Sequence, residues 1–265
     1  AGNLGALTID ANGNWNYSVE NQLEDIQSLP EGETLTDTFT VQSLDGTSQQ
    51  IVITINGEND PAIVSGDDAG EVTEDFEVLF IGENEYLIDD GALIVSDPDD
   101  GQNSIDPDSV ESDAGNLGDL LIDADGNWSY QVNNRLSEIQ ELPSGGSLVD
   151  TFTVKTFDGT PQQIVITIKG TNDSAIIDGD DEGEVTEDFE VQLIGDVEYL
   201  AETGQLTVSD PDNGESFFDP DSVISNAGNL GALTIDANGN WNYSIENQLP
   251  EVQNMLTGES FEETF

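Results

Sequence analysis

Acidic and amide side chains recur in two nearly identical stretches of the chain, residues 55–75 and 168–188. The residues of interest are Asn59, Asp60, Glu74 and Asp75 in the first stretch, and Asn172, Asp173, Glu187 and Asp188 in the second. No Lys or Arg accompanies the first set, and only Lys169 lies near the second. Hard oxygen ligands without cationic partners are what Ca²⁺ prefers in proteins. We therefore expect each stretch to be a calcium-clamped joint between two tandem domains.

An Asp-Pro-Asp sequence follows a strand pattern twice, with acidic residues Asp97 and Asp99 in one copy and Asp210 and Asp212 in the other. This spacing directs two carboxylates into one loop, where they could share a cation. The alternative is a solvated turn in which proline only marks the bend. A second acidic turn, Asp106 to Asp108 with a copy at 219–221, is left open between these two interpretations.

Asp158 stands in an Asp-Gly turn, and its counterpart in the preceding repeat is Asp45. We expect Asp158 at the same end of its domain as Asp60 and the Asp97–Asp99 loop. Four carboxylates at one end of a domain favour a metal site over a solvated surface.

The charge balance of the whole chain supports a role for cations. Lys and Arg together number 3 against 57 Asp and Glu, which gives a net charge of −54. Such a chain excludes charge-driven binding to nucleic acid or to anionic membrane surfaces. Two surface carboxylates about 4 Å apart repel by roughly 4 kcal/mol, so metal ions are expected to neutralise them. An acidic disordered chain is the alternative, but 35% hydrophobic residues in strand patterns favour buried cores.

Several classes of function find no support in the composition. The chain has no cysteine and no histidine, so it lacks disulfides, cysteine-based zinc or redox sites and the usual general base. A glycosidase could use paired carboxylates, but a catalytic pair recurring once per repeat is improbable, and we expect no enzyme. No apolar run approaches the roughly 18 residues of a membrane span, so no membrane insertion is expected.

A repeat of 113 residues organises the sequence, as the spacing of Trp15, Trp128 and Trp241 shows. This length suits one β-sandwich domain and exceeds that of solenoid units. We expect residues 1–60 to be the C-terminal part of one repeat, 61–173 a complete repeat, and 174–265 a third repeat lacking its last strands. The chain then resembles a window on a longer array. Alternatively, a strand from a neighbouring chain could fill the open edge and build a filament.

Within a repeat, alternating runs predict strands. Residues 5–10 and 14–19 flank an Asn-Gly turn, which is typical of a β-hairpin. The aspartates before this turn and its copies superficially resemble a calcium loop, but the hairpin is favoured; they are Asp10, Asp123 and Asp236. Residues 76–81 are expected to begin another strand. The recurring Trp and Tyr are expected to be core anchors rather than a sugar-binding platform.

The ordered motifs Gly-Asn-Trp-x-Tyr, Asp-x-Phe-Thr-Val, Asp-Gly-Thr, Ile-x-Gly-x-Asn-Asp and Val-Thr-Glu-Asp span essentially the whole chain. Together they resemble the VCBS repeats, which are bacterial cadherin-like repeats of giant RTX-type surface adhesins. The resemblance implies an all-β chain of tandem Ig-like or cadherin-like Greek-key β-sandwich domains in an elongated array. It also implies a secreted or bacterial cell-surface location.

The resemblance further implies Ca²⁺ ions between domains, because cadherins bind calcium there. The first joint would use Asn59 and Asp60 with Asp97, Asp99 and Asp158, and the second would use Glu74 and Asp75 with Asn172, Asp173, Asp210 and Asp212. The expected function is that of calcium-rigidified extender repeats supporting cell adhesion or biofilm. The expected partners are neighbouring repeats and possibly like chains in a fibre. A strand-exchanging filament subunit and a carbohydrate-binding module are the alternatives.

Overall fold

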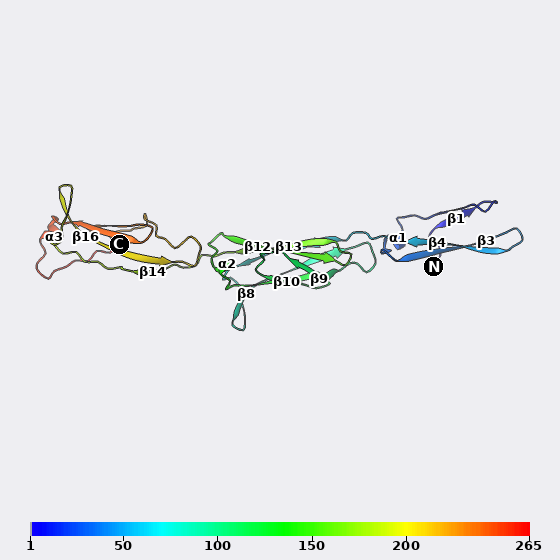
Figure 1. Ribbon diagram of the computed structural model, residues 1–265, viewed down its shortest axis with the longest axis horizontal. Helices are drawn as coiled ribbons and strands as arrows, with labels where there is room; N and C mark the ends of the chain where they lie inside the picture. The colour runs from blue at the N-terminus through cyan, green and yellow to red at the C-terminus, as the bar shows by residue number, and fades with distance from the viewer. Residues whose placement is uncertain (1) are drawn as a thin grey trace. The chain divides into compact units, whose positions relative to one another are not determined.

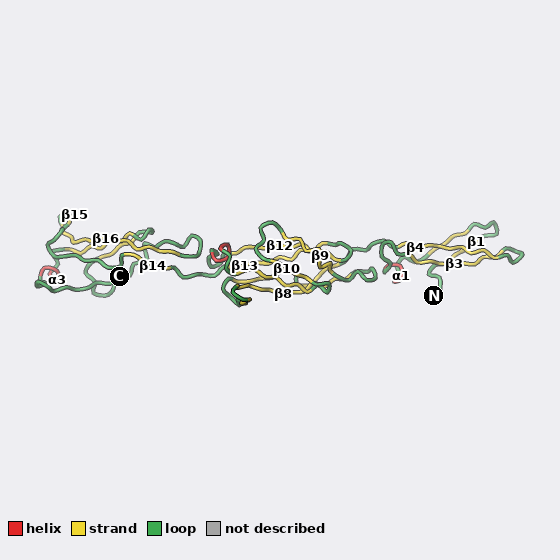
Figure 2. The backbone as a smooth tube through the Cα atoms, turned by 60° about the horizontal axis from the view of Figure 1, so that its bottom comes forward, coloured by secondary structure: helices red, strands yellow, loops and turns green. Residues whose placement is uncertain are grey.

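Strands and turns make up nearly all of the computed structural model, which describes residues 2–265 (Figures 1 and 2). Contacts divide the chain into two compact units, Ala1–Arg135 with Ser147–Lys169, and Leu136–Gly146 with Gly170–Phe265. Ala1 lies outside the described residues. No helix among residues 2–265 has the length and apolar character needed to cross a membrane.

The first repeat contributes two antiparallel hairpins to the first unit. Its elements are β1 (Ala6–Ile9), β2 (Trp15–Ser18), the single-turn helix α1 (Glu24–Gln27), β3 (Thr34–Gln42) and β4 (Ser48–Asn56). The β1–β2 hairpin closes on the expected Asn-Gly turn, where Gly13 has a φ of 84°. Only a residue that tolerates positive φ fits such a turn.

The second repeat holds the complete set of elements. They are β5 (Ile63–Gly66), β6 (Ala69–Thr73), β7 (Leu79–Ile81), β8 (Asn84–Ser96), β9 (Ile105–Ser112), β10 (Asp119–Ile122), β11 (Asn127–Asn133), α2 (Ser137–Gln140), β12 (Ser147–Thr156) and β13 (Pro161–Lys169).

Two sheets form the sandwich of the second repeat. One has the strand order β10-β11-β8-β5, with β7 also paired to β8, and the other has the order β6-β13-β12-β9. All pairs are antiparallel except β6 with β13, which run parallel. The expected all-β, Ig-like sandwich is confirmed.

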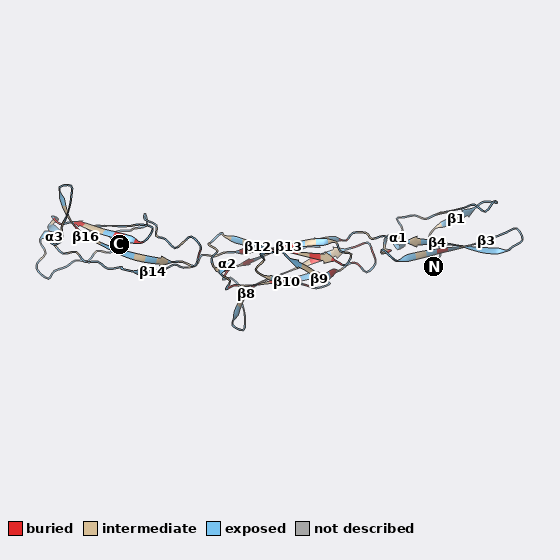
Figure 3. Cartoon of the chain, viewed as in Figure 1, coloured by how far each residue is buried: buried red, intermediate tan, exposed pale blue. Residues whose placement is uncertain are grey.

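The alternation of apolar residues explains the core between these sheets. Ile164, Ile166 and Ile168 on β13 are fully buried at period two, as expected for one face of a strand (Figure 3). Across the core, the ring of Tyr130 on β11 meets the ring of Phe152 on β12 edge-on, with centroids 6.0 Å apart. Trp128 is only 2% exposed and donates its indole N–H to the carbonyl of Asp67. Trp128 and Tyr130 are therefore core anchors, as predicted, whereas the prediction is wrong for Trp15 of the first repeat, which is 51% exposed.

The third repeat builds one sheet with the order β14-β16-β18-β17, and β15 also pairs with β16. Its elements are β14 (Ile176–Gly179), β15 (Gln192–Ile194), β16 (Val197–Ser209), β17 (Ala232–Ile235), β18 (Asn240–Glu246) and α3 (Pro250–Gln253). Residues 180–186, the counterpart of β6, form no strand. In the second repeat, β6 takes its hydrogen bonds from β13, and the described residues contain no counterpart of β13 for the third repeat.

The strand expected over residues 76–81 begins only at Leu79. Asp75 and Glu77 adopt φ values of 55° and 52°, in the left-handed region that interrupts an extended backbone. The Asp75 turn is held by Asn134, whose Oδ1 accepts from Asp75 N and whose Nδ2 donates to Asp75 Oδ1. This partner is distant in the sequence, so the apolar pattern gave no sign of the turn.

A carboxylate holds recurring sequence motifs of each repeat together by hydrogen bonds. Asp150 on β12 is 1% exposed and accepts hydrogen bonds from Leu117 N, Gly118 N and the Tyr130 hydroxyl. The Tyr130 ring lies so close to Gly118 that a Cβ there would be 2.5 Å from it. Asp37 makes the same three contacts in the first repeat, and Glu263 makes them in the third. These acids are saturated with donors and serve the fold.

We predict that Asp150→Ala destabilises the second repeat by about 1.5–3 kcal/mol, because three buried donors lose a charged acceptor. Urea unfolding followed by circular dichroism measures this loss. Asp119→Ala, which removes an exposed acid from β10, should change stability by less than about 0.5 kcal/mol. Equal effects of the two substitutions would contradict a structural role for Asp150.

Candidate metal centre

The first acidic loop, residues 97–102, starts where β8 ends. Asp97 Oδ1 accepts a hydrogen bond of 2.8 Å from Asp99 N, so the first carboxylate closes the turn that carries the second. Asn103 Oδ1 accepts a 2.7 Å bond from Asp97 N and closes the loop from its other side. Local hydrogen bonds thus hold two carboxylates in one tight loop.

Two oxygens of this loop are buried without a donor. Asp97 is 8% exposed and Asp99 is fully buried, and no group in residues 2–265 donates to Asp97 Oδ2 or Asp99 Oδ1. Leaving a buried acceptor unsatisfied is costly, and more so when it is charged. The three basic residues lie elsewhere in exposed ion pairs, Arg135 with Glu85, Lys155 with Glu111 and Lys169 with Glu71. The loop therefore has the chemistry of a cation site.

Two further acids predicted from the sequence reach this loop. Asp60 N donates to Asp99 Oδ2 at 2.9 Å, and Ala62 N donates to Asp158 Oδ2 at 3.1 Å. Burial raises the pKa of Asp97 above its ordinary value, and the negative charges of Asp158, Asp99 and Asp60 raise it further. The structure thus gathers Asp60, Asp97, Asp99 and Asp158 at one end of the second repeat, with the half-buried Asn59 beside them.

Asp158 is held in its charged form by donors. Burial works against ionisation, but hydrogen bonds from Thr156 Oγ1, from Thr160 N and Oγ1, and from Ala62 N outweigh it. These bonds keep the pKa of Asp158 well below its ordinary value. The carboxylate stays negative across the physiological range and is oriented toward the segment that links the first two repeats.

A backbone hydrogen bond joins the first acidic loop directly to the first repeat. Asp100 N donates to Ser28 O, the carbonyl just after α1, at 3.0 Å. The counterpart bond in the second unit runs from Asn213 N to Glu141 O, also at 3.0 Å. Each acidic loop is therefore fastened to the residue that follows the short helix of the preceding repeat.

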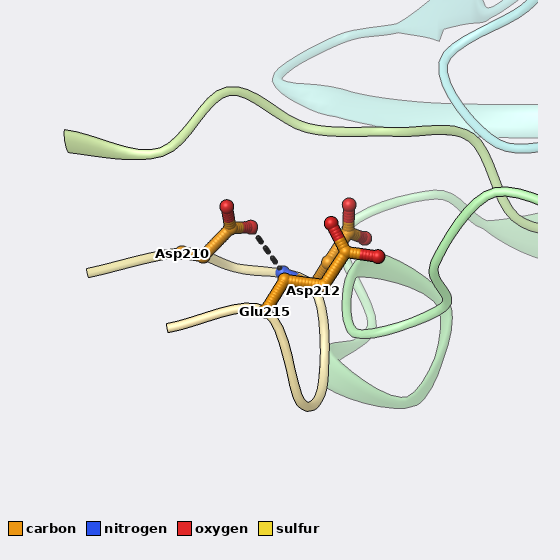
Figure 4. A group of neighbouring side chains, drawn as sticks. All are labelled: Asp210, Asp212 and Glu215. Atoms are coloured by element: carbon orange, nitrogen blue, oxygen red, sulfur yellow. Dashed lines mark hydrogen bonds between the residues drawn. The ribbon is translucent and has the colours of Figure 1, made fainter. Parts of the chain in front are cut away.

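The second acidic loop, residues 210–215, repeats the two hydrogen bonds of its aspartates but differs in sequence at two positions. Asp210 Oδ1 accepts from Asp212 N at 2.9 Å, and Asp173 N donates to Asp212 Oδ2 at 2.9 Å. Asp210, Asp212 and Glu215 each place a carboxylate oxygen within 4.8 Å of the other two (Figure 4). Sequence reasoning did not single out Glu215. Its counterpart in the first loop is Gln102, so aligning the two loops would have exposed the difference.

Glu74 and Asp75 do not lie beside Asn59 and Asp60, although one stretch of sequence contains all four. Between them β6 runs parallel to β13, and Glu74 N donates to the carbonyl of Lys169 at the far end of β13. Glu74 is fully buried there, while Asp75 is exposed and bonded to Asn134. The interpretation of this stretch as a single joint is wrong, because a strand carries its two halves to opposite ends of the domain.

The remaining predicted site residues lie in less enclosed positions. Asn172 is exposed, and its Nδ2 donates to Asp173 O. Asp188 is exposed and accepts from Asn247 Nδ2, while Glu187 is half-buried. Asp45 is exposed and accepts from the Ser43 hydroxyl and from Thr47 N. No metal role for these residues follows from their contacts alone.

The other acidic turns differ from the two acidic loops in burial. Asp108 N donates to Asp106 Oδ1 at 3.1 Å, the same local bond as in the first acidic loop, but both residues are exposed at the start of β9. Asp123 accepts from Asn127 N and Nδ2 and closes the β10–β11 hairpin. The hairpin interpretation of Asp123 is confirmed by these bonds.

Comparisons with known proteins agree with this architecture. Residues 59–170 match the family model of the bacterial cadherin-like domain. This part of the chain is therefore similar to a bacterial cadherin-like domain. No curated protein sequence matches the chain.

Solved structures with some similarity include the extracellular domain of protocadherin gamma-B4, at 15% identity and a TM-score of 0.43, covering 96% of this chain and 38% of that one. Cadherin domains 1–4 of protocadherin gamma-B7 share 15% identity at a TM-score of 0.43, covering 96% and 58%. Titin domains I67–I69 share 10% identity at 0.36, covering 94% and 74%. The chain thus spans less than two thirds of either protocadherin chain.

We predict that two substitutions in the second repeat have opposite effects on the stability of metal-stripped protein at pH 7. Asp158→Asn should cost about 1–3 kcal/mol, because an amide would point a donor at existing donors. Asp97→Asn should leave stability unchanged or raise the melting temperature, because it removes a buried charge that lacks a donor at Oδ2. Thermal melts of the two variants measure both effects.

The expected pH dependence of stability also has opposite signs for Asp158 and Asp97. The folded pKa of Asp158 lies below its ordinary 3.8, so its contribution to stability is present above that pH and is lost as the pH falls further. The folded pKa of Asp97 lies above 3.8, so its contribution is present below that pH and is lost as the pH rises through the folded pKa. Equal destabilisation by both substitutions at pH 7 would contradict this assignment.

Proposed function

We propose that the chain consists of calcium-stabilised extender repeats of a bacterial cell-surface adhesin or extracellular fibre, secreted and exposed to millimolar Ca²⁺. The observation that carries the proposal is the pair of buried, donor-free carboxylate oxygens on Asp97 and Asp99. The match of residues 59–170 to a bacterial cadherin-like domain supports the extracellular, adhesion-related setting.

The residues fit a hard divalent cation. Asp60, Asp97, Asp99 and Asp158 offer carboxylate oxygens only, and Asn59 adds an amide oxygen, which is the donor set that Ca²⁺ takes. At the boundary between the second and third repeats, Asp210 and Asp212 with Asn172 and Asp173 would form the equivalent set. The contribution of Glu74 and Asp75 to that boundary is part of the same proposal. Asp45, Glu187 and Asp188 are the equivalent positions at the boundaries with further repeats.

The proposed action is mechanical. Without Ca²⁺, the carboxylates around residues 59–60 and the first acidic loop repel one another, because no protein cation neutralises them. A bound ion replaces this repulsion with attraction and fastens the linking segment to Asp99 and Asp158, next to the existing bonds from Asp60 N and Ala62 N. The ion would therefore stabilise the domain and stiffen its connection to the preceding repeat.

A carbohydrate-binding role finds less support. In the second repeat, Trp128 and Tyr130 are buried and present no ring face to a sugar, although the counterpart Trp15 of the first repeat is 51% exposed. Strand addition between chains stays a prediction that these contacts do not test.

We predict that Ca²⁺ at about 10 mM raises the free energy of unfolding by about 1.4–2.7 kcal/mol per site, for dissociation constants of roughly 0.1–1 mM. Thermal melts and small-angle scattering in chelator, CaCl₂ and MgCl₂ measure the stabilisation and the stiffness. The double variant Asp97→Asn, Asp99→Asn should lose the part of the response that comes from the first acidic loop.

The chain offers a matched control in its other Asp-Pro-Asp turn. Asp106→Asn with Asp108→Asn makes the same chemical change in an exposed copy of the motif, so the Ca²⁺ response should be retained. If the wild-type protein gained no stability from Ca²⁺, or if both double variants responded alike, the proposed function would be wrong.

A further inference from the structure

The two acidic loops differ at two positions, where Asn213 replaces Asp100 and Glu215 replaces Gln102, and the second of these lies beside their carboxylates. In the first loop, Gln102 is 7% exposed and its Nε2 lies 3.5 Å from Asp99 Oδ2, so an amide donor stands near the carboxylate. In the second loop, Glu215 occupies the corresponding position and has no N–H to offer. The second loop therefore has a third carboxylate, which can bind a cation, where the first loop has an N–H donor.

The three carboxylates of the second loop converge on one point. Their oxygens lie within 4.8 Å of one another, although all three residues come from a single six-residue segment (Figure 4). Such an approach of like charges is unfavourable unless a cation lies between them. Acidic residues on an exposed loop could simply turn apart, so convergence alone does not make a site.

Burial supplies the second observation. Asp212 is 1% exposed, and no group in the described chain donates to its Oδ1, while its Oδ2 accepts from Asp173 N. Asp210 Oδ1 is likewise committed to Asp212 N. Asp212 cannot turn toward solvent without breaking the bond to the linking segment, so one charged oxygen stays fixed inside the loop beside Glu215.

We propose that residues 210–215 form a site for a hard divalent cation, with Asp210, Asp212 and Glu215 as ligands. The proposal rests on the proposed function in that both loops bind Ca²⁺, and it adds Glu215 as a third carboxylate ligand in the second loop, where the first loop has Gln102. The number of charged ligands is a main determinant of Ca²⁺ affinity, so the affinity of the second loop should depend on Glu215.

Calorimetric titration of the whole chain with CaCl₂ tests the assignment. The double variant Asp97→Asn, Asp99→Asn isolates the second loop, and adding Glu215→Gln to it should weaken Ca²⁺ binding by about tenfold or more. In the wild-type background, Glu215→Gln should weaken one phase of binding and leave the rest unchanged, a measurement that does not depend on folding of the double variant. The converse change Gln102→Glu should tighten binding at the first loop.

The control is Glu251→Gln, which makes the same chemical change at an exposed position of α3 and should leave every phase of the titration unchanged. Circular dichroism confirms that each variant is folded. If Glu215→Gln gave the wild-type titration curve, Glu215 would not be a ligand and the inference would fail while the proposed function stood. If the wild-type chain bound no Ca²⁺ at all, both would fail.

Discussion

The scarcity of positive charge is the constraint on which the rest of the structure depends. Three basic residues face 57 acidic ones, and each of the three is engaged in an exposed ion pair with a glutamate. Exposed pairs of this kind contribute little to stability. Every carboxylate that enters the fold must therefore be satisfied by N–H or O–H donors, by water, or by a cation from outside the chain.

Enclosed acids outside the two acidic loops take the first route. The buried Asp150 collects two backbone N–H groups and a tyrosine hydroxyl, and the half-buried Asp158 collects donors from a turn and from the linking segment. Because these bonds stabilise the charged form, such residues behave as structural acceptors. Their recurrence in each repeat explains why acidic residues keep fixed positions in so acidic a chain.

The two acidic loops are the exception, and their carboxylate oxygens without donors are the basis of the proposed function. Asp97, Asp99 and Asp212 are buried as deeply as Asp150 or nearly so, yet each keeps an oxygen without a donor. The other buried acids of this fold have hydrogen-bond donors. In the first acidic loop, the amide of Gln102 approaches Asp99 and supplies a donor only in part. Under the proposed function, an external cation would satisfy these oxygens at both repeat boundaries.

Local regularity carried most of the sequence prediction. The hairpins, the alternating faces of β12 and β13, and the burial of Trp128 all follow from patterns that neighbouring residues define, and they were found where expected. Prediction failed where a long-range contact redirects the chain. The turn at Asp75 depends on Asn134, and the parallel pairing of β6 with β13 separates Glu74 from Asp60.

The sequence by itself determined the repeat length, the all-β class, the shortage of cations and the acidic residues that recur at each boundary. It favoured a metal role for Asp97–Asp99 but left Asp106–Asp108 open, because both are Asp-Pro-Asp turns, and they form the same local hydrogen bond. Only the tertiary structure decided which pair is enclosed, since burial and the absence of donors depend on segments brought from elsewhere in the chain. The same holds for Glu215, whose meaning lies in the two carboxylates that the folded loop places beside it.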